Sequence, residues 1–182
     1  MTTIRHEPPE ALRTIPLEDL LKRRVARFDQ IPPDWDAFAD SRIEGRRRAQ
    51  HRFVGAGGSG KHDDPNVIPA GAFTVSVMRV PPGQGGSAHT HEVEEVFFVL
   101  EGRLTVFFED RAGKQVSAEL GRWEMVSCPP GILHGFENRS DADVYMQTMI
   151  GSARPGPVGY ADDEIYREES RRLAERTPVI TK

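Results

Sequence analysis

Residues 83–102 read GQGGSAHTHEVEEVFFVLEG, and residues 129–138 read PPGILHGFEN. Glycine and proline punctuate both stretches, which is typical of strands joined by tight turns. Three histidines and one glutamate stand in them at fixed offsets, namely His89, His91, Glu95 and His134. All four side chains are of types that bind divalent metal ions. The two stretches therefore predict a metal site supported by strands and turns.

The spacing of these side chains suits a single ion. Residues two apart on a strand point to the same face with Cα atoms about 6.6 Å apart, so His89 and His91 can converge on one point. Glu95 follows at the start of the next expected strand, and the second stretch would bring His134 in from across the fold. Three imidazoles and one carboxylate suit Fe, Mn, Co, Ni, Cu or Zn. Six-coordination would leave two positions open for water, oxygen or a bidentate substrate, as a catalytic site requires.

The chain around these stretches has the texture of a mainly β protein. Segments rich in Val, Phe, Thr and Met recur at short intervals, at residues 72–80, 96–100, 104–109, 116–120, 123–128 and 143–150. Turn signals containing glycine or proline separate them. Short strands at this spacing predict an antiparallel sandwich or barrel.

Helical patterns are expected only outside the β region. Apolar residues in 16–28 fall on one helical stripe, which predicts an amphipathic helix packed on the barrel or on a partner subunit. Residues 32–71 have no regular pattern, and a polar helix is expected from Asp162 to Arg176. The expected organisation is therefore an N-terminal extension over 1–71, a barrel over 72–152 and a helical tail over 153–182. The run Val96–Leu100 is apolar at every position, so both faces of this strand must pack against other residues. A second copy of the chain in a homodimer is the simplest way to cover the second face.

Composition narrows the functional classes. The chain has 182 residues and a net charge of −4, which argues against broad attraction to nucleic acid. Cys128 is the only cysteine, so an intrachain disulfide is impossible and the residue is expected to fill a packing position. No apolar stretch approaches the ~20 residues that span a bilayer, and no secretory signal is visible in the first twenty residues. We expect a cytoplasmic protein that binds neither membranes nor nucleic acid.

The two stretches resemble the motifs of the cupin family. The first cupin motif, G-x5-H-x-H-x3,4-E-x6-G, is matched at every fixed position of 83–102. The second, G-x5-P-x-G-x2-H-x3-N, is matched at its last four fixed positions, Pro129, Gly131, His134 and Asn138. The departure is at its start, where Trp123 stands in the glycine position and Gly121 lies two residues too early.

This resemblance covers about residues 70–150 and implies a double-stranded β-helix barrel with one metal ion on His89, His91, Glu95 and His134. It implies that Gly83, Gly102, Gly131 and Asn138 are structural. Among cupin activities, we expect a dioxygenase-type oxidoreductase that uses iron(II) on a small oxygenated organic molecule. Glu95 would bind the metal or act as a base, and the expected pocket residues are Phe97, Val99 and Phe136. The alternatives are a redox-neutral isomerase, decarboxylase or lyase, and a cupin that binds a small ligand without catalysis.

Other polar features are assigned no function. Gly55–Lys61 resembles the start of a phosphate-binding loop, but His62 replaces its hydroxyl residue and Pro65 blocks the helix that should follow, so a flexible loop is expected. His6, His51 and His62 are expected to face solvent. The run Arg46–Arg48 is expected to form a solvated turn.

Overall fold

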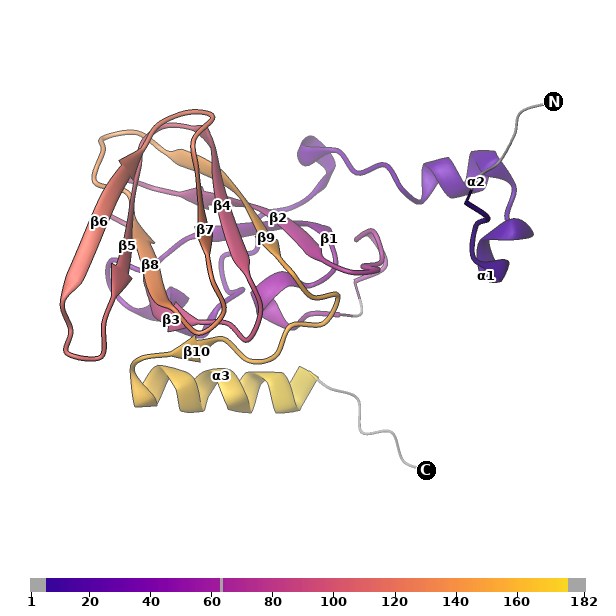
Figure 1. Ribbon diagram of the computed structural model, residues 1–182. Helices are drawn as coiled ribbons and strands as arrows, with labels where there is room; N and C mark the ends of the chain where they lie inside the picture. Colours follow the sequence, from indigo (N-terminus) through magenta and orange to yellow (C-terminus); the bar gives the residue numbers. More distant parts are fainter. Residues whose placement is uncertain (1–5, 63, 177–182) are drawn as a thin grey trace.

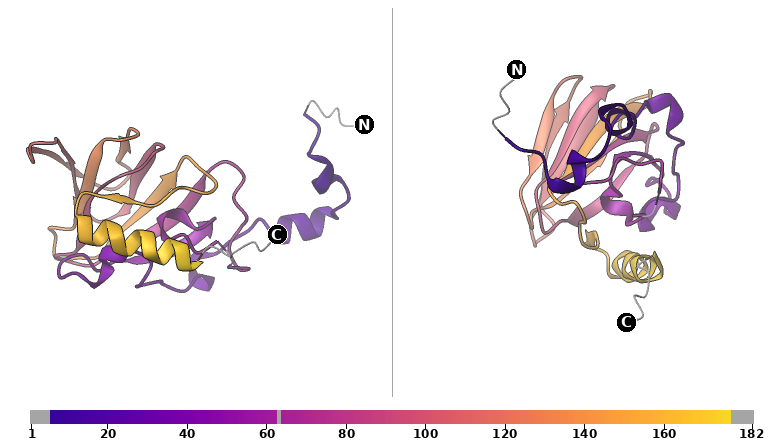
Figure 2. Two further views of the ribbon diagram at one scale, coloured as in Figure 1. Left: turned by 90° about the horizontal axis from the view of Figure 1, so that it is seen from below. Right: turned by 90° about the vertical axis from the view of Figure 1, so that its right-hand side faces the viewer.

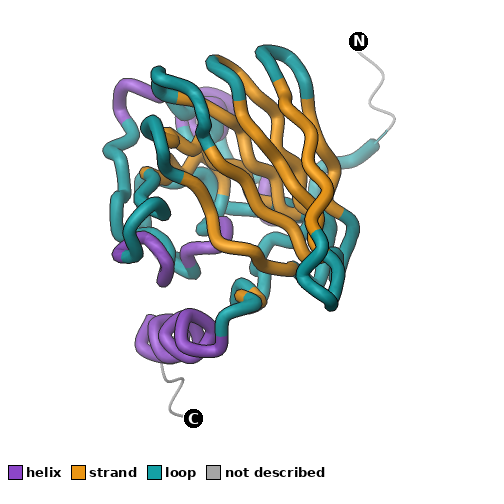
Figure 3. Tube along the Cα trace, turned by 90° about the vertical axis from the view of Figure 1, so that its left-hand side faces the viewer, coloured by secondary structure: helices purple, strands orange, loops and turns teal. Residues whose placement is uncertain are grey.

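A computed structural model describes residues 6–62 and 64–176, and its body is a barrel of two antiparallel sheets (Figure 3). One sheet has the strand order β1-β2-β9-β4-β7 and the other the order β10-β3-β8-β5-β6. The strands of the first sheet are β1 (Ala49–Val54), β2 (Thr74–Val80), β9 (Val144–Ile150), β4 (Glu95–Glu101) and β7 (Met125–Cys128). Those of the second are β10 (Gly159–Tyr160), β3 (Gly85–Thr90), β8 (Leu133–Glu137), β5 (Leu104–Glu109) and β6 (Gln115–Leu120). The predicted mainly β barrel is confirmed.

Alternation along the strands places one face of each sheet in a common interior. In β4 the side chains of Glu95, Phe97 and Val99 are buried while the intervening ones are half-buried, so the all-apolar run still follows the period of two. β9 repeats this pattern over its whole length. The inward apolar side chains of both sheets form one core cluster, which includes Val80, Phe97, Val99, Leu104, Val144 and Met146.

In the described part of the chain, three α-helices lie outside the barrel. α3 (Asp163–Arg176) crosses below β10 at one end of the barrel (Figures 1 and 2), close to the predicted 162–176. α1 (Glu10–Arg13) and α2 (Leu17–Lys22) lie apart from the barrel in the same views. No helix in the described part of the chain is long and apolar enough to cross a membrane.

The predicted helix over 16–28 is too long. α2 ends at Lys22, and residues Phe28–Gln30 form a separate 3₁₀ turn, η1. Leu17 and Leu21 are 81% and 66% exposed, so these residues of α2 do not pack on the barrel, whereas Phe28 at the end of the stripe contacts the ring of Tyr145 in β9. A short helix without tertiary packing gains little from propensity alone, which explains why it ends early.

The N-terminal extension contributes more to the barrel than its irregular pattern suggested. β1 lies within the segment assigned to the extension, yet it pairs with β2 and completes one sheet. Two further 3₁₀ turns flank it, η2 (Ala39–Arg42) and η3 (Gly57–Ser59). The loop expected to be flexible at 55–61 is thus partly regular, and Gly57–Ser59 are buried. Six residues with no clear alternation gave no strand signal, which is why β1 was missed.

Two polar residues expected at the surface are buried. Arg48 is 3% exposed rather than part of a solvated turn, because its guanidinium pairs with Asp40 inside the barrel. His51 is 5% exposed, contacts the ring of Phe28 and places Nδ1 2.9 Å from the carbonyl oxygen of Ile31. Both residues gained partners from distant segments, which local sequence does not reveal. His6 is exposed and His62 is half-buried.

Cys128 fills an apolar packing position, as expected. It is 1% exposed, belongs to the core cluster and pairs in register with Glu95 across β4 and β7. Burial and the nearby carboxylate of Glu95 raise the pKa of its thiol, so the thiolate is disfavoured. Asn138 has the expected structural role, since its side-chain amide donates to the carbonyls of Val80 and Ala142.

Candidate metal centre

The ends of three strands, β3, β4 and β8, bring the four predicted ligands together inside the barrel. His89 lies on β3 directly opposite His134 on β8, and Glu95 opens β4. His91 follows the end of β3, where its carbonyl accepts a hydrogen bond from the backbone N–H of Gly131. Gly131 has a φ of 75°, a left-handed conformation that suits glycine and sets the approach of β8. All four candidate ligands are at most 5% exposed.

The imidazoles converge on one carboxylate oxygen. The distances from Nε2 to Oε2 of Glu95 are 3.3 Å for His89, 3.4 Å for His91 and 2.9 Å for His134. His89, His91 and Glu95 form the tightest group, with one potential ligand atom each within 4.8 Å of one another. His134 lies outside that group but contacts the same oxygen from β8.

Backbone carbonyls select the tautomer of two imidazoles. Nδ1 of His89 lies 2.7 Å from the carbonyl of Ser87, and Nδ1 of His134 lies 2.7 Å from the carbonyl of Ile132. A carbonyl only accepts, so Nδ1 must carry the proton and a neutral ring then has a lone pair on Nε2. Both lone pairs point at a carboxylate oxygen that also only accepts. A metal ion at the centre, or a proton on an imidazole, would resolve this mismatch, and the donor set fits a divalent transition metal.

The charges at the site favour the ligand forms of these residues. Burial alone would raise the pKa of Glu95, but the imidazoles of His91, His134 and His89 outweigh it and hold the pKa well below its usual range. Burial lowers the pKa of His91, and this effect exceeds the opposing attraction of Glu95. Glu95 is therefore a carboxylate and His91 a neutral imidazole near pH 7, as metal binding requires.

A small cavity adjoins the candidate ligands. His89, His91, Glu95, Phe97 and Phe136 line one part of it. Phe97 and Phe136 are two of the three residues expected in the pocket, and their rings meet edge to face with centroids 5.2 Å apart. Val99 is not among the lining residues; as the third inward residue of β4 it lies deeper, in the apolar core.

Sequence reasoning missed the opposite part of the cavity lining. It comes from the N-terminal extension, the first sheet and the tail, and includes Phe38, Arg48, Gln50, Ser76, Thr148, Val158 and Tyr160. Polar residues in the otherwise apolar strands β2 and β9 gave no clear indication that Ser76 and Thr148 face inward. Nothing local marked Arg48 or Tyr160, because only the pairing of β1 and β10 with the sheets brings them inward.

The turn η3 closes one side of this cavity. Gly57 and Gly58 line it, and a Cβ on Gly58 would lie 3.2 Å from Val158 and 4.0 Å from the ring of His91. Only a residue without a side chain therefore fits there without displacing a neighbour.

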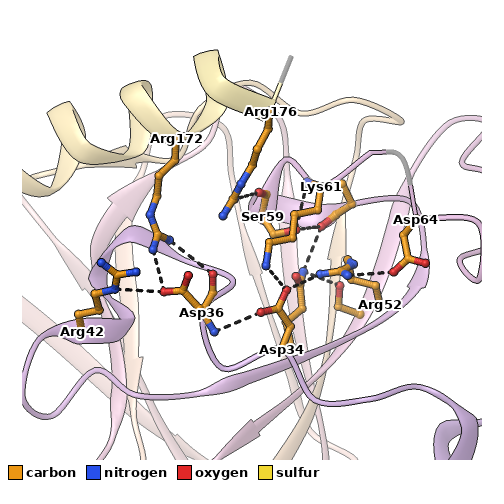
Figure 4. A network of polar contacts seen from close by, with 12 residues as sticks. Asp34, Asp36, Arg42, Arg52, Ser59, Lys61, Asp64, Arg172 and Arg176 are labelled. Atoms are coloured by element: carbon orange, nitrogen blue, oxygen red, sulfur yellow. Dashed lines mark hydrogen bonds and ion pairs between the residues drawn. The ribbon is translucent and has the colours of Figure 1, made fainter. Parts of the chain in front are cut away.

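Ion pairs hold the segments around this turn (Figure 4). Asp34 accepts hydrogen bonds from Arg52 at 2.6 Å and from Lys61 at 2.5 Å, and Arg176 of α3 donates to the carbonyl of Ser59. Arg172 of the same helix pairs with Asp36 at 2.8 Å. The network thus fastens both the N-terminal extension and α3 to the closed side of the site.

Comparison with known proteins agrees with this geometry. Residues 76–150 match the family model described as a cupin domain. The chain is a member of the cupin superfamily. Germin-like protein subfamily 2 member 1 of Arabidopsis thaliana is 35% identical over 85 residues, which cover 45% of this chain and 39% of that protein. A Zymomonas mobilis protein provisionally named quercetin 2,3-dioxygenase is 34% identical over 108 residues, covering 58% of this cupin and 42% of that protein.

A solved structure extends the likeness beyond the matched motifs. The polyketide cyclase RemF from Streptomyces resistomycificus has a TM-score of 0.58 with this cupin and is 19% identical, covering 82% of this chain and 96% of that one. At that identity the likeness shows the fold alone. The cupin spans about two fifths of the length of the two curated relatives above, so their activities are not transferred by the match itself.

Proposed function

We infer that this cupin is a metal-dependent oxidoreductase of the dioxygenase type, acting on a small oxygenated organic molecule. One observation carries the proposal. Three imidazole Nε2 atoms face a single buried carboxylate oxygen of Glu95, at 2.9–3.4 Å, beside a small cavity. A set of four ligands leaves open positions on a six-coordinate ion, which is what distinguishes a reactive site from a structural one.

The chain's own residues would divide the work at this centre. His89, His91, His134 and Glu95 would hold the ion, and bound iron(II) would supply the redox chemistry that side chains lack. Glu95 would remain ionised and serve as a ligand, because its lowered pKa makes it a weak base. Phe97 and Phe136 would exclude water from the reacting groups. The oxidoreductase class is supported by the Zymomonas relative's name.

The cavity sets an upper limit on the size of the substrate. The space open to the centre of a water-sized sphere is about 20 Å³, which accommodates only a handful of non-hydrogen atoms. A larger molecule would have to displace η3, which lines the cavity at Gly57 and Gly58. A small substrate is therefore the proposal that requires no rearrangement.

Metal analysis of ligand variants tests the centre. Wild-type protein should contain about one metal ion per chain, and His134→Ala should lose nearly all of it because a catalytic site needs each of its few ligands. His51→Ala is the matched control, since His51 is equally buried but does not line the cavity. Unchanged metal content in both His134→Ala and His91→Ala would overturn the assignment.

Oxygen consumption then separates the reaction classes. Iron(II)-loaded protein should consume oxygen with a small oxygenated substrate, and the His134→Ala variant should not. Full turnover with zinc or nickel and no oxygen uptake would instead establish redox-neutral isomerase, decarboxylase or lyase chemistry. Metal binding without turnover of any substrate screened would favour the ligand-binding alternative.

We further propose that the protein acts as a homodimer. Leu17 and Leu21 of α2 are largely exposed, as are Val116, Trp123 and Met125 on the barrel. Burying these side chains against a second copy would remove apolar surface from water. Sedimentation equilibrium should give twice the chain mass of 20.4 kDa, and replacing Leu17 and Leu21 by Ser should shift it toward one chain. A wild-type monomer at all concentrations would contradict this.

A further inference from the structure

Opposite the candidate ligands, the cavity wall carries polar side chains with unused hydrogen-bonding atoms. Arg48, Gln50 and Thr148 are 3%, 1% and 4% exposed and all line the cavity. Within the described part of the chain, Nε of Arg48, Oε1 of Gln50 and Oγ1 of Thr148 have no hydrogen-bond partner. Buried polar atoms are rarely left unpaired, because the lost hydrogen bond is costly. Three of them around one cavity indicate a polar occupant.

Arg48 is held rigidly while one of its donors stays free. Its Nη1 donates to Asp40 at 3.1 Å and to the carbonyl of Gly85 at 3.1 Å, and the guanidinium lies 4.3 Å from the ring centroid of Phe38. The Nε–H group is left over. Tyr160 also hydrogen-bonds to this guanidinium, so the Nε–H group is the donor that remains for one oxygen of a carboxylate.

Gln50 and Thr148 add one acceptor and one hydroxyl. The amide of Gln50 is oriented by the carbonyl of Ala56, which can only accept, so Nε2 points there and to Ser76 while Oε1 remains an acceptor. Thr148 lies on β9 between Ser76 of β2 and Phe97 of β4. An occupant that uses all three atoms offers oxygens to Arg48 and Thr148 and a hydroxyl hydrogen to Gln50.

The charges around the cavity favour an anion once a metal is bound. Arg48 is balanced by Asp40, with 3.0 Å between Nη1 and Oδ1, and Glu95 offsets only one of the two charges of a divalent ion. With neutral imidazoles the site then carries one positive charge in excess. An uncompensated charge in a buried cavity is expensive, and a singly charged anion removes the imbalance.

On the basis of the metal centre assigned above, we propose that the substrate is a short 2-hydroxy carboxylate of two or three carbons. Its carboxylate is bound by Arg48 and Thr148, and its hydroxyl donates to Gln50. This class provides the required hydrogen-bonding groups, the single negative charge and a size that fits the small cavity. The proposal specifies recognition and depends on the metal centre only for the excess charge.

Binding measurements on cobalt(II)-loaded full-length protein test the proposal. Glycolate, acetate and glycolamide serve as probes, read out by calorimetry and by the visible absorption of the bound cobalt. Glycolate should bind most tightly, acetate about five- to twentyfold more weakly for want of one hydrogen bond, and neutral glycolamide more weakly still. The metal-free protein should bind glycolate far more weakly than the loaded protein.

Variants of Gln50 and Thr148 assign the contacts. Gln50→Met should abolish the advantage of glycolate over acetate while leaving acetate affinity nearly unchanged. Thr148→Val should weaken both acids about five- to twentyfold, and Thr148→Ser, which keeps the hydroxyl, should bind like wild type. Arg48 and Asp40 stay unaltered in these tests, because removing either would leave the other charge buried and unpaired.

The outcomes separate this inference from the proposed function. Failure of the wild type to bind cobalt would overturn the metal centre and the substrate assignment together. Normal cobalt binding with equal affinity for glycolate and glycolamide, or with no saturable response to either, would overturn the substrate class alone. In that case the unpaired atoms of the cavity wall are satisfied by water.

Discussion

The two ends of the barrel interior differ in the polarity of their side chains, although the same strands form both. On β9 the inward residues change from Val144 and Met146 at one end to Thr148 near the other. On β2 they change from Val80 and Met78 to Ser76 and Thr74 over the same length. One end is thus filled by apolar side chains, and the other surrounds the cavity and the candidate metal ligands.

Because of this contrast, the residues that stabilise the fold lie at one end of the strands and those that line the candidate site lie at the other. Close-packed apolar side chains at the first end contribute most of the free energy of folding. The polar end keeps unpaired atoms such as Nε of Arg48 and Oγ1 of Thr148, which cost stability unless a ligand satisfies them. Substitutions two residues apart on one strand should therefore have different consequences.

Met146→Ala should produce the largest loss of stability. Met146 is fully buried in the core cluster, and truncating a buried Met costs about 2–5 kcal/mol in the free energy of unfolding. Metal content should be unchanged, because Met146 does not line the cavity. Thr148→Val is the matched control: it removes an unpaired buried hydroxyl at nearly constant volume, so it should raise the free energy of unfolding by about 1 kcal/mol instead of lowering it. Urea denaturation and metal analysis check both variants; loss of metal in Met146→Ala would show that the two ends are not independent.

A buried acid beside the polar end should make stability depend on pH. Glu169 of α3 is 1% exposed, and burial raises its pKa to about 7 against the attraction of Arg176 and Arg172. Asp40 adds to the rise. Between pH 4.5 and 7 the folded protein retains this proton and the unfolded chain loses it, so stability falls as pH rises through this window.

Glu169→Gln should remove this component of the pH dependence. The variant should be more stable than wild type at pH 8 by about 1–3 kcal/mol and should lose the advantage at pH 4.5. Denaturation curves at both pH values measure the difference between variant and wild type, which cancels the titration of other groups. Glu164→Gln, an exposed change in the first turn of α3, is the control. An identical pH profile for Glu169→Gln and wild type would show that Glu169 is not held protonated.

Sequence alone predicted the barrel, six of its strand regions and the four candidate ligands, because each depends on local spacing. The apolar runs of β4 and β9 and the offsets around His89 and His134 are readable within a few residues. The part of the cavity lining that comes from the N-terminal extension and the tail was not predictable in this way. Arg48 becomes a cavity residue only because β1 pairs with β2, and Tyr160 only because β10 pairs with β3. Such long-range pairing leaves no trace in local composition.

Trp123 could be predicted only in part. The sequence showed that it departs from the second cupin motif, and the structure shows what this departure does to the backbone. Trp123 stands where the cupin motif has glycine and has a φ of 70°, the only positive value among the described residues other than glycine. Its backbone N–H donates to the carbonyl of Val99 at 2.9 Å, which fixes this conformation at the edge of the apolar end. The glycine backbone geometry is therefore kept without the glycine, at a cost of about 1–2 kcal/mol.

Comparing Trp123→Gly with Trp123→Ala should reveal this strain as the smallest of the predicted effects. The indole is 60% exposed and packs only partly, with its centroid 5.9 Å from the ring of Phe98, so both variants lose similar contacts. Alanine retains the Cβ that disfavours a positive φ, whereas glycine does not. Trp123→Gly should therefore be the more stable variant by about 1 kcal/mol, reversing the usual order of alanine and glycine. Thermal unfolding measures the difference, and an alanine variant as stable as the glycine variant would show that the apolar end of the barrel carries no strain at this turn.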